Sequence, residues 1–488
     1  MLTSTNPESG TVANVYDTGS AGDLFTTTFP KPDASSGTVT ACYGSWSGSA
    51  CTSSGWDVMH RLTYVSFSDG SPSIGYGYDS SNVWGTPVSN PKGRMVLANH
   101  ASQGAALFSY DTRGRLINTW QCTPINCGTS SYPLSYTYNY VNQPQATTDA
   151  AGNTFSKAYN AAGEVTSLQS SKTGTNYPQY LLNNISYNAL GEVVSATYGD
   201  GIVRTNTYDR MGRPTEIQDG TTPTYRVYLT YYGNGSVKTF NDTVSGAYTY
   251  TYDAFNRLVS STNTAQSYSW TYDQFGNRWH QDLTAGTGYT VDLSFNNSNR
   301  ITTSGYSYDA AGNLLRDGSA CNPCWQYDDN GNLVSSSYGS SAASYSYDAL
   351  GRRVEKVSGA TTYDFVLDGS NPLDEYQGSS WPTVWSRTTD GVFTYANGTT
   401  YFNRTDHLET PRVSTDYTGT VRRTETMGPF GDGFTESYTG LDFTGFAGGV
   451  WDQENNGDHF GAREYAKTQG RWLTPDPAGL VAVDLTNP

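Results

Sequence analysis

Apolar and polar residues alternate with a period of two along many short stretches of this chain. Three tyrosines in Tyr248–Tyr252 are separated by threonines, and Tyr268–Tyr272 alternates aromatic with small polar residues in the same way. A half-buried β-strand gives this period, because successive side chains point to opposite faces of a sheet. We therefore expect the rings of Tyr248–Tyr252 on one face and the threonines on the other.

Each alternating stretch ends in a turn signal. The strand that ends at Tyr272 is followed by Asp273 and, three residues later, by Gly276. An Asp carboxylate accepts hydrogen bonds from backbone N–H groups one and two residues on. Gly supplies the positive φ that closes a four- or five-residue hairpin loop. The phrase Tyr272–Arg278 therefore predicts a strand, a tight turn and a second strand.

The same phrase recurs, and its cleanest copies are about 19 to 21 residues apart. Such a step holds two strands and two turns, so each copy is predicted to be one β-hairpin. A β-propeller blade needs about 40–45 residues and does not fit. Hairpins of this kind stack edge to edge into one antiparallel sheet, which twist coils into a spiral shell or open barrel. Tyrosines of successive hairpins are expected to stack in ladders. The copies begin at Tyr110, Tyr159, Tyr187, Tyr208, Tyr252, Tyr272, Tyr308, Tyr327 and Tyr347.

Three regions follow from where the repeat is regular. Residues 1–75 are predicted to form an irregular N-terminal cap with degenerate copies, and residues 76–362 the spiral of hairpins. The spacing of about 20 residues between copies is no longer seen after residue 362, so residues 363–488 are predicted to form a separate C-terminal core.

Composition and charge narrow the function. The 488 residues include 39 Tyr and 52 Gly, which suits short strands joined by turns. A formal net charge of −16 argues against a nucleic-acid partner, since phosphate binding needs clustered Lys and Arg. No apolar run reaches the length of a membrane span. The first residues do not form a signal peptide, which predicts a fragment of a longer exported chain or another export route. The sequence predicts no cofactor.

Six cysteines form three local couples: Cys42 with Cys51, Cys122 with Cys127, and Cys321 with Cys324. Short-range couples with no cysteine left over predict structural disulfides in an oxidising compartment. The alternative for the last couple is half a zinc site or a redox pair. Zinc requires four ligands, and the other couples are far away in sequence, so disulfides are favoured.

The recurrent Tyr-Asp-x-x-Gly-Arg/Asn-Leu phrase resembles the YD repeat of bacterial Rhs and wall-associated proteins, Tc toxin C subunits and animal teneurins. Asp406–Arg412 and Pro429–Gly431 resemble the DHLGTPR and PFG signatures of the Rhs-associated core, with Glu409 where that family usually has Gly. The resemblance implies a β-strand spiral around a hollow shell, closed by a C-terminal core plug. In the toxin members this shell holds a C-terminal toxic domain. We expect His407 in the first signature to make a structural hydrogen bond.

The end of the chain resembles the part of the family that cuts itself. The DPxGL ending matches Asp476–Leu480, and the resemblance implies aspartyl-type self-cleavage after Leu480. Hydrolysis would need two carboxylates, one that activates water and one that donates a proton to the scissile carbonyl. Asp476 is the first candidate, with Asp452 and then Asp458 as its partner, and Arg463 would hold a carboxylate ionised.

One departure from the family bears on this chemistry. Ala466 stands where the family has an aspartate. If that aspartate belongs to the catalytic pair, the site is inactive. The alternative is that Asp452, Asp458 and Asp476 are turn and plug residues. Enzymatic activity is therefore at most single-turnover self-cleavage.

Three functional interpretations stay open. The chain is predicted to be a secreted or cell-surface bacterial shell around a polymorphic-toxin cargo, although no toxin domain is expected before Pro488. Alternatively, it is an extracellular structural or adhesive protein that assembles with like chains into polymers or filaments. As a third possibility, its aromatic concave face binds glycans.

Overall fold

The fold is almost entirely β-structure. The computed structural model describes residues 3–6, 10–16, 22–30, 36–48, 50–52, 57–68, 70–338, 342–378, 384–386, 388–389, 391–437, 444–461 and 463–476. Within these ranges, the one helix is a short 3-10 turn, η1 (Phe446–Gly448). The predicted all-β class is confirmed.

Twenty-four strands form one antiparallel sheet in which strands follow one another in chain order. Among the described strands, β1 pairs only with β2 and β28 only with β27, so the sheet is open. The predicted stack of hairpins is confirmed. The strands are β1 (Thr3–Asn6), β2 (Gly10–Tyr16), β3 (Leu24–Pro30), β4 (Ser36–Cys42), β7 (Tyr64–Phe67), β8 (Ile74–Tyr78), β11 (Met95–His100), β12 (Gly104–Tyr110), β13 (Leu116–Cys122), β14 (Tyr132–Tyr138), β15 (Pro144–Thr148), β16 (Thr154–Tyr159), β17 (Val165–Ser170), β18 (Tyr180–Tyr187), β19 (Val193–Tyr198), β20 (Val203–Tyr208), β21 (Pro214–Asp219), β22 (Tyr225–Tyr231), β23 (Val237–Asp242), β24 (Gly246–Tyr252), β25 (Leu258–Thr262), β26 (Gln266–Tyr272), β27 (Arg278–Gly286) and β28 (Val291–Asp292).

The remaining strands form smaller antiparallel sheets. Two hairpins branch from the first part of the chain, β5 (Ser45–Trp46) with β6 (Cys51–Thr52) and β9 (Asn82–Val83) with β10 (Thr86–Pro87). The later sheets are β29 (Tyr306–Tyr308) with β30 (Leu314–Asp317); β31 (Trp325–Tyr327), β32 (Leu333–Ser336), β33 (Ala343–Tyr347), β34 (Arg353–Ser358), β35 (Thr361–Asp368), β36 (Asn371–Gln377) and β37 (Val384–Ser386); β38 (Thr388–Thr389), β39 (Phe393–Ala396), β40 (Thr399–Thr405), β41 (Pro411–Asp416), β42 (Val421–Thr426) and β43 (Thr435–Glu436); and β44 (Val450–Asp452), β45 (Gly457–Phe460), β46 (Arg463–Ala466) and β47 (Arg471–Trp472).

The repeated turn is held by its Asp and the residue after its Gly. Asp273 accepts hydrogen bonds at Oδ1 from the backbone N–H groups of Phe275 and Asn277, each at 2.9 Å, which are two and four residues on. The Asn277 amide donates to the second Asp273 oxygen at 2.8 Å, and Gly276 has a φ of 87°. The Arg or Asn that follows the Gly in the motif therefore closes the turn onto the carboxylate.

The repeated tyrosine joins neighbouring strands. The Tyr272 hydroxyl donates a 2.7 Å hydrogen bond to the carbonyl of Leu258, at the start of the preceding strand. The same bond recurs at Tyr110, Tyr138, Tyr187, Tyr208, Tyr231, Tyr327 and Tyr347. Within β24 the tyrosines share the more buried face, as predicted, and the Tyr248 and Tyr250 rings stack 6.0 Å apart. Tyrosines of successive repeats were expected to stack in ladders. In the structure, hydrogen bonds from their hydroxyls to the backbone of the neighbouring repeat hold these tyrosines.

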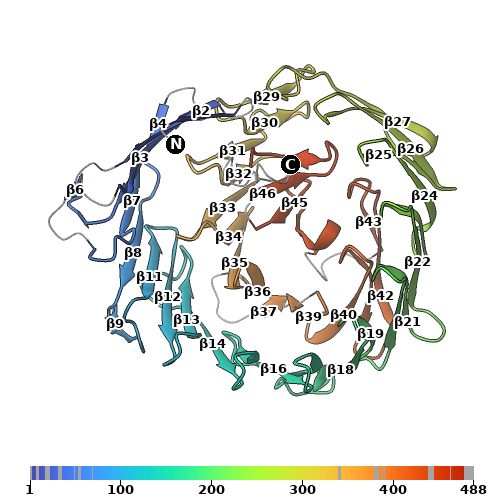
Figure 1. Cartoon of the computed structure of the whole chain (residues 1–488), viewed down its shortest axis with the longest axis horizontal. Coiled ribbons are helices and arrows are strands. Elements are labelled where there is room, and N and C mark those ends of the chain that lie inside the picture. The colour runs from blue at the N-terminus through green and yellow to red at the C-terminus, as the bar shows by residue number, and fades with distance from the viewer. Residues whose placement is uncertain are drawn as a thin grey trace.

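The chain winds inward after the long sheet. In Figure 1 the strands from β2 to β27 follow one another around a ring, and the strands from β33 to β46 lie inside it. We call the long sheet the wall and the strands from β31 onward the inner turn. The Tyr76 hydroxyl bonds the carbonyl of Ala349, 273 residues away, whereas Tyr289 bonds Asp432 across only 143 residues. The separation is smaller at the second contact because the inner turn has a smaller circumference than the wall.

The apolar core lies between the wall and the inner turn. Phe155 and Tyr198 of the wall contact Phe393 and Phe402 of the inner turn, with ring centroids 5.7 and 6.0 Å apart. Another cluster joins Leu134 of the wall to inner-turn residues of β35 and β36. The inner turn therefore supplies the apolar partners of the wall's inner face.

Candidate functional site

Asp452, at the end of β44, lies in a buried cluster of charges. Its side chain is fully buried, and Arg353 and Lys356 of β34 both reach it. Arg353 Nη1 pairs with Oδ2, and Lys356 Nζ lies 3.2 Å from Oδ1. Burial alone opposes ionisation of Asp452, but the two cations outweigh it and hold its pKa below the usual range.

Further charged groups extend this cluster. Arg353 Nη1 is also 3.6 Å from Glu464, whose Oε1 lies 2.6 Å from Nδ1 of His459. Lys356 Nζ is 3.2 Å from Glu454, so the β34 cations hold acidic groups from three places near the chain end. Sequence reasoning missed this cluster, because an Arg and a Lys on one strand do not reveal that another layer covers them.

Asp458, on β45, faces a different cation. Its carboxylate is fully buried and lies 3.0 Å from Nζ of Lys467. Burial raises the pKa of Asp458 to about 6, and it lowers the pKa of Lys467, whose Nζ lies 5.2 Å from the rings of Phe434 and Trp451. Asp458 therefore takes up a proton closer to neutral pH than an exposed carboxylate does.

Asp476 pairs with the arginine that the sequence singled out. Arg463 Nη2 lies 3.2 Å from Asp476 Oδ2, and the Asp476 side chain is half exposed. The guanidinium also stacks over Trp472, 4.2 Å from the ring centroid. The three predicted carboxylates thus each meet a different cation or pair of cations. Leu480, after which cleavage is predicted, lies outside the described residues.

The Asp406–Arg412 signature forms a turn of the repeated kind. Asp406 accepts hydrogen bonds from the backbone of Leu408 and Thr410, and Arg412 Nε lies 3.0 Å from its second oxygen. Glu409 takes the glycine position with a φ of 63°. The expected hydrogen bond of His407 is wrong: its buried Nδ1 has no hydrogen-bond partner, and burial lowers its pKa. The ring instead packs 5.8 Å from Phe240.

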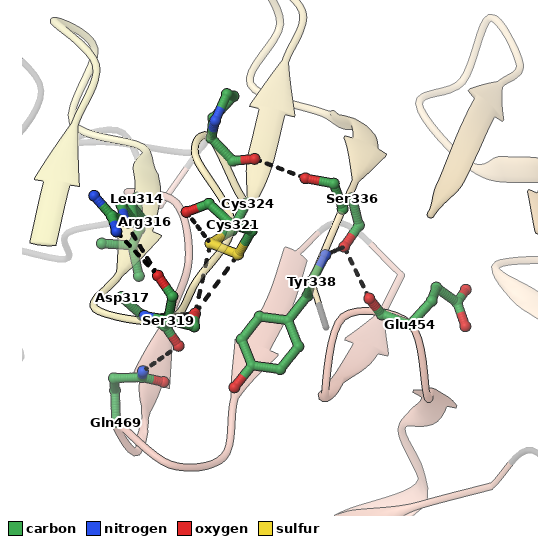
Figure 2. The surroundings of a disulfide bond; sticks show 12 residues. Leu314, Arg316, Asp317, Ser319, Cys321, Cys324, Ser336, Tyr338, Glu454 and Gln469 are labelled. Atoms are coloured by element: carbon green, nitrogen blue, oxygen red, sulfur yellow. Dashed lines mark hydrogen bonds between the residues drawn. A yellow bond between two sulfur atoms is a disulfide. The ribbon is translucent and has the colours of Figure 1, made fainter. Parts of the chain in front are cut away.

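All three predicted disulfides are present: Cys42–Cys51, Cys122–Cys127 and Cys321–Cys324. Figure 2 shows the third beside Ser319, whose hydroxyl lies 3.6 Å from both sulfurs. The segments around this disulfide also contact the chain end. Gln469 donates to Asp317 at 3.1 Å, and Ser336 donates to the carbonyl of Glu454 at 3.0 Å. The disulfide therefore fixes a loop on which the last sheet rests.

Two neighbouring acidic side chains beside the charge cluster, Glu355 and Asp364, predict that the free energy of unfolding depends on pH. Glu355 of β34 lies opposite Asp364 of β35, and burial followed by the Asp364 charge raises the pKa of Glu355 to about 7. The pKa of Glu355 exceeds the unfolded value of about 4.3. The stability that the protonated Glu355 side chain contributes is therefore complete below about pH 4, and it is lost as the pH rises through about 7. We expect Glu355→Gln to raise the free energy of unfolding at pH 8 by about 1–2 kcal/mol, with little gain at pH 4.

Urea unfolding of both proteins between pH 4 and pH 8 measures this effect. Glu409→Gln, at an exposed position, is the matched control and should follow the wild-type profile. A Glu355→Gln gain that is equal at all pH values would contradict the assignment of the titration to Glu355.

None of the helices in the described part of the chain is long and apolar enough to span a membrane.

Comparisons with known proteins agree with this geometry. The family model described as Teneurin YD-shell matches residues 222–486. Teneurin-1 of Mus musculus is 26% identical over 315 residues, covering 59% of this chain. The tRNA3(Ser)-specific nuclease WapA of Bacillus spizizenii is 26% identical over 315 residues, covering 55% of this chain. The chain spans only 10% and 13% of the lengths of these two relatives.

Solved structures match over nearly the whole chain. The TcdB2-TccC3 crystal structure has a TM-score of 0.78 at 16% identity and covers 99% of this chain, which in turn spans 27% of that one. The Tc holotoxin pore of Photorhabdus luminescens gives a TM-score of 0.78 with the same coverage of this chain. These two structures share the fold of the wall and inner turn. Since the family model covers more than half of the residues, this chain belongs to the teneurin YD-shell family.

Proposed function

We propose that this chain is the shell of an exported bacterial protein, which holds a toxic C-terminal cargo inside its wall and frees it by cutting after Leu480. The observation that carries the proposal is the inward course of the chain. Arg278 of the wall donates to the carbonyl of Thr468 at 2.9 Å, and Arg471 donates to the carbonyl of Asn299. These contacts fix the last described sheet against the inner side of the wall, so the described part of the chain ends inside the ring (Figure 1).

The electrostatics of the carboxylates support a division of labour in the cleavage. Asp476, half exposed and ion-paired with Arg463, is the carboxylate that takes a proton from the attacking water. Asp458, with its pKa of about 6, is the better proton donor to the scissile carbonyl oxygen. Asp452 is held ionised by Arg353 and Lys356, which makes it a poor acid. Hydrolysis then adds one water across the peptide bond and releases a carboxylate and an amine.

The export part of the proposal rests on the disulfides. Three disulfides, with no free cysteine among the described residues, fit an oxidising compartment such as the cell surface. The relative named as a tRNA nuclease illustrates the class of cargo, but the matched part of that protein is a small fraction of its length.

Intact mass of the full chain tests the cleavage. We expect freshly purified protein to convert to a species ending at Leu480, and we expect Asp476→Asn to stay full length. Asp476 is half exposed, so its replacement should not unfold the protein. Asp292→Asn, at a side chain with 71% exposure, is the control and should cut normally. A wild-type chain that keeps its full mass for days at pH 5 to 8 would rule out self-cleavage.

Assembly with like chains is the second candidate, because the sheet is open at β1 and β28. The described edge strands are short, four and two residues long, and short edges are a known defence against strand addition. Filaments in negative stain would favour this candidate over encapsulation.

A further inference from the structure

An open cleft of about 780 Å³ lies at the N-terminal end of the wall, away from the carboxylates of the proposed cleavage. It is formed by β3, β4, β7, the β5–β6 hairpin and the turns before β8 and β12. In Figure 1 the β6 label stands at the outer margin of the ring. Its volume suits a small organic ligand of several rings.

Aromatic rings form one side of this cleft. Trp46 and Tyr64 stack with their centroids 4.7 Å apart and their planes 18° from parallel. Phe25 and Phe67 also line the cleft. The Cys42–Cys51 disulfide ties β6, which pairs with Trp46, to the end of β4, and so restrains the hairpin that carries the indole. A rigid aromatic platform favours ligands with a flat apolar face.

A row of hydroxyl groups crosses the floor of the cleft. Thr26 of β3 lies opposite Thr40 of β4, which lies opposite Ser66 of β7. Neighbouring strands are about 4.8 Å apart, so the three hydroxyls lie at regular intervals on one face. Among the described residues, none of these three side chains makes a hydrogen bond to another residue, which leaves them free to donate to and accept from a ligand.

Charged side chains are absent from the described lining of the cleft, although the whole chain carries a net charge of −16. A phosphate or carboxylate ligand would require Lys or Arg here, and a cationic ligand would require acidic groups. An uncharged ligand that offers both apolar C–H faces and many hydroxyl groups fits the lining best. From the stacked rings and the hydroxyl row, we propose that this cleft binds a neutral oligosaccharide of two or three pyranose units.

Titration of the full-length protein with neutral oligosaccharides tests the proposal. The probes are cellotriose, maltotriose and chitotriose, each followed by intrinsic tryptophan fluorescence and by calorimetry. At least one of them is expected to bind with a dissociation constant of roughly 0.1–1 mM. Trp46→Ala should weaken that binding at least tenfold, because it removes half of the platform.

Two further variants keep the test decisive. Thr40→Val retains the shape of the side chain and removes one hydroxyl, so it should weaken binding by about three- to tenfold even if Trp46→Ala fails to fold. Trp84→Ala, at a tryptophan that is 64% exposed and outside the cleft, should bind like the wild type.

Three results would overturn the proposal. The first is no binding of any of the three probes at 10 mM. The second is binding that Trp46→Ala and Thr40→Val leave unchanged. The third is binding only of anionic heparin oligosaccharides or of an apolar peptide, which would assign the cleft to another class of ligand. None of these results depends on whether the chain cuts itself after Leu480.

Discussion

Asp452→Asn is expected to lower the free energy of unfolding by about 3–5 kcal/mol. Asn has the same shape as Asp but carries no charge, so Arg353 and Lys356 lose the carboxylate that both contact. Both cations are almost fully buried and have no route to water without disturbing β34. Urea unfolding followed by tyrosine fluorescence measures the loss. We also expect β34 and β44, which this ion pair joins, to be the first segments that a protease cuts.

Asp292→Asn is the matched control for this change. It removes the same charge from an ion pair with His280, but the Asp292 side chain is 71% exposed. Exposed pairs contribute less than about 1 kcal/mol. Equal losses in the two variants would show that burial does not decide the effect and that Asp452 does not hold β44 against β34.

Arg404→Met is expected to cost a similar amount, about 3–5 kcal/mol. The Arg404 side chain is fully buried between the layers, where it pairs with Asp200 and lies 3.9 Å from Asp219. Its guanidinium also sits 3.8 Å from the centroid of the Tyr198 ring. Methionine fills much of the volume but leaves the Asp200 carboxylate without its cationic partner. Asp219, in contrast, keeps the ion pair with Arg204 at 2.8 Å.

A double variant separates charge from packing at this position. Adding Asp200→Asn to Arg404→Met removes the unpaired carboxylate, so the double variant should be more stable than Arg404→Met alone. Arg422→Met is the control, since Arg422 pairs with Asp416 at 2.7 Å but is 53% exposed, and it should cost less than about 1 kcal/mol. A double variant no more stable than Arg404→Met would mean that lost packing, rather than the stranded charge, causes the destabilisation.

The local structure of the wall could be predicted from the sequence because short-range chemistry determines it. Asp273 and Gly276 encode their turn within five residues, and the alternation in Tyr248–Tyr252 encodes which face is buried. The disulfides could be predicted for the same reason, since each joins cysteines no more than nine residues apart.

The contacts between layers could not be predicted in this way. Nothing near Arg404 in the sequence indicates that Asp200, 204 residues away, is its partner. Arg353 and Lys356 read as ordinary exposed residues of a strand, yet both are buried under the last sheet. The pairing of the repeated tyrosines with backbone carbonyls was also missed, because the alternation shows the face of a ring but not the partner of its hydroxyl.

At the candidate site, the identities of the residues could be predicted from the sequence, but their surroundings could not. The resemblance pointed to Asp476 and Arg463, which the structure places 3.2 Å apart. Asp452 was expected before Asp458 as the second carboxylate. That order depends on burial and on the cations of β34, which come from a different part of the chain.

The inward winding of the chain also has a consequence for the order of folding. The hairpins of the wall close over short loops, whereas the inner turn reaches the wall across separations of 143 to 273 residues. Closing such loops in a disordered chain costs more entropy than closing a hairpin, so non-local contacts form late. During synthesis the N-terminal part of the chain is made first, so the wall forms first. The finished wall then serves as the surface on which the last strands pack. Folding of this molecule should therefore run from the outside inward, and the docking of the inner turn should be its slow step.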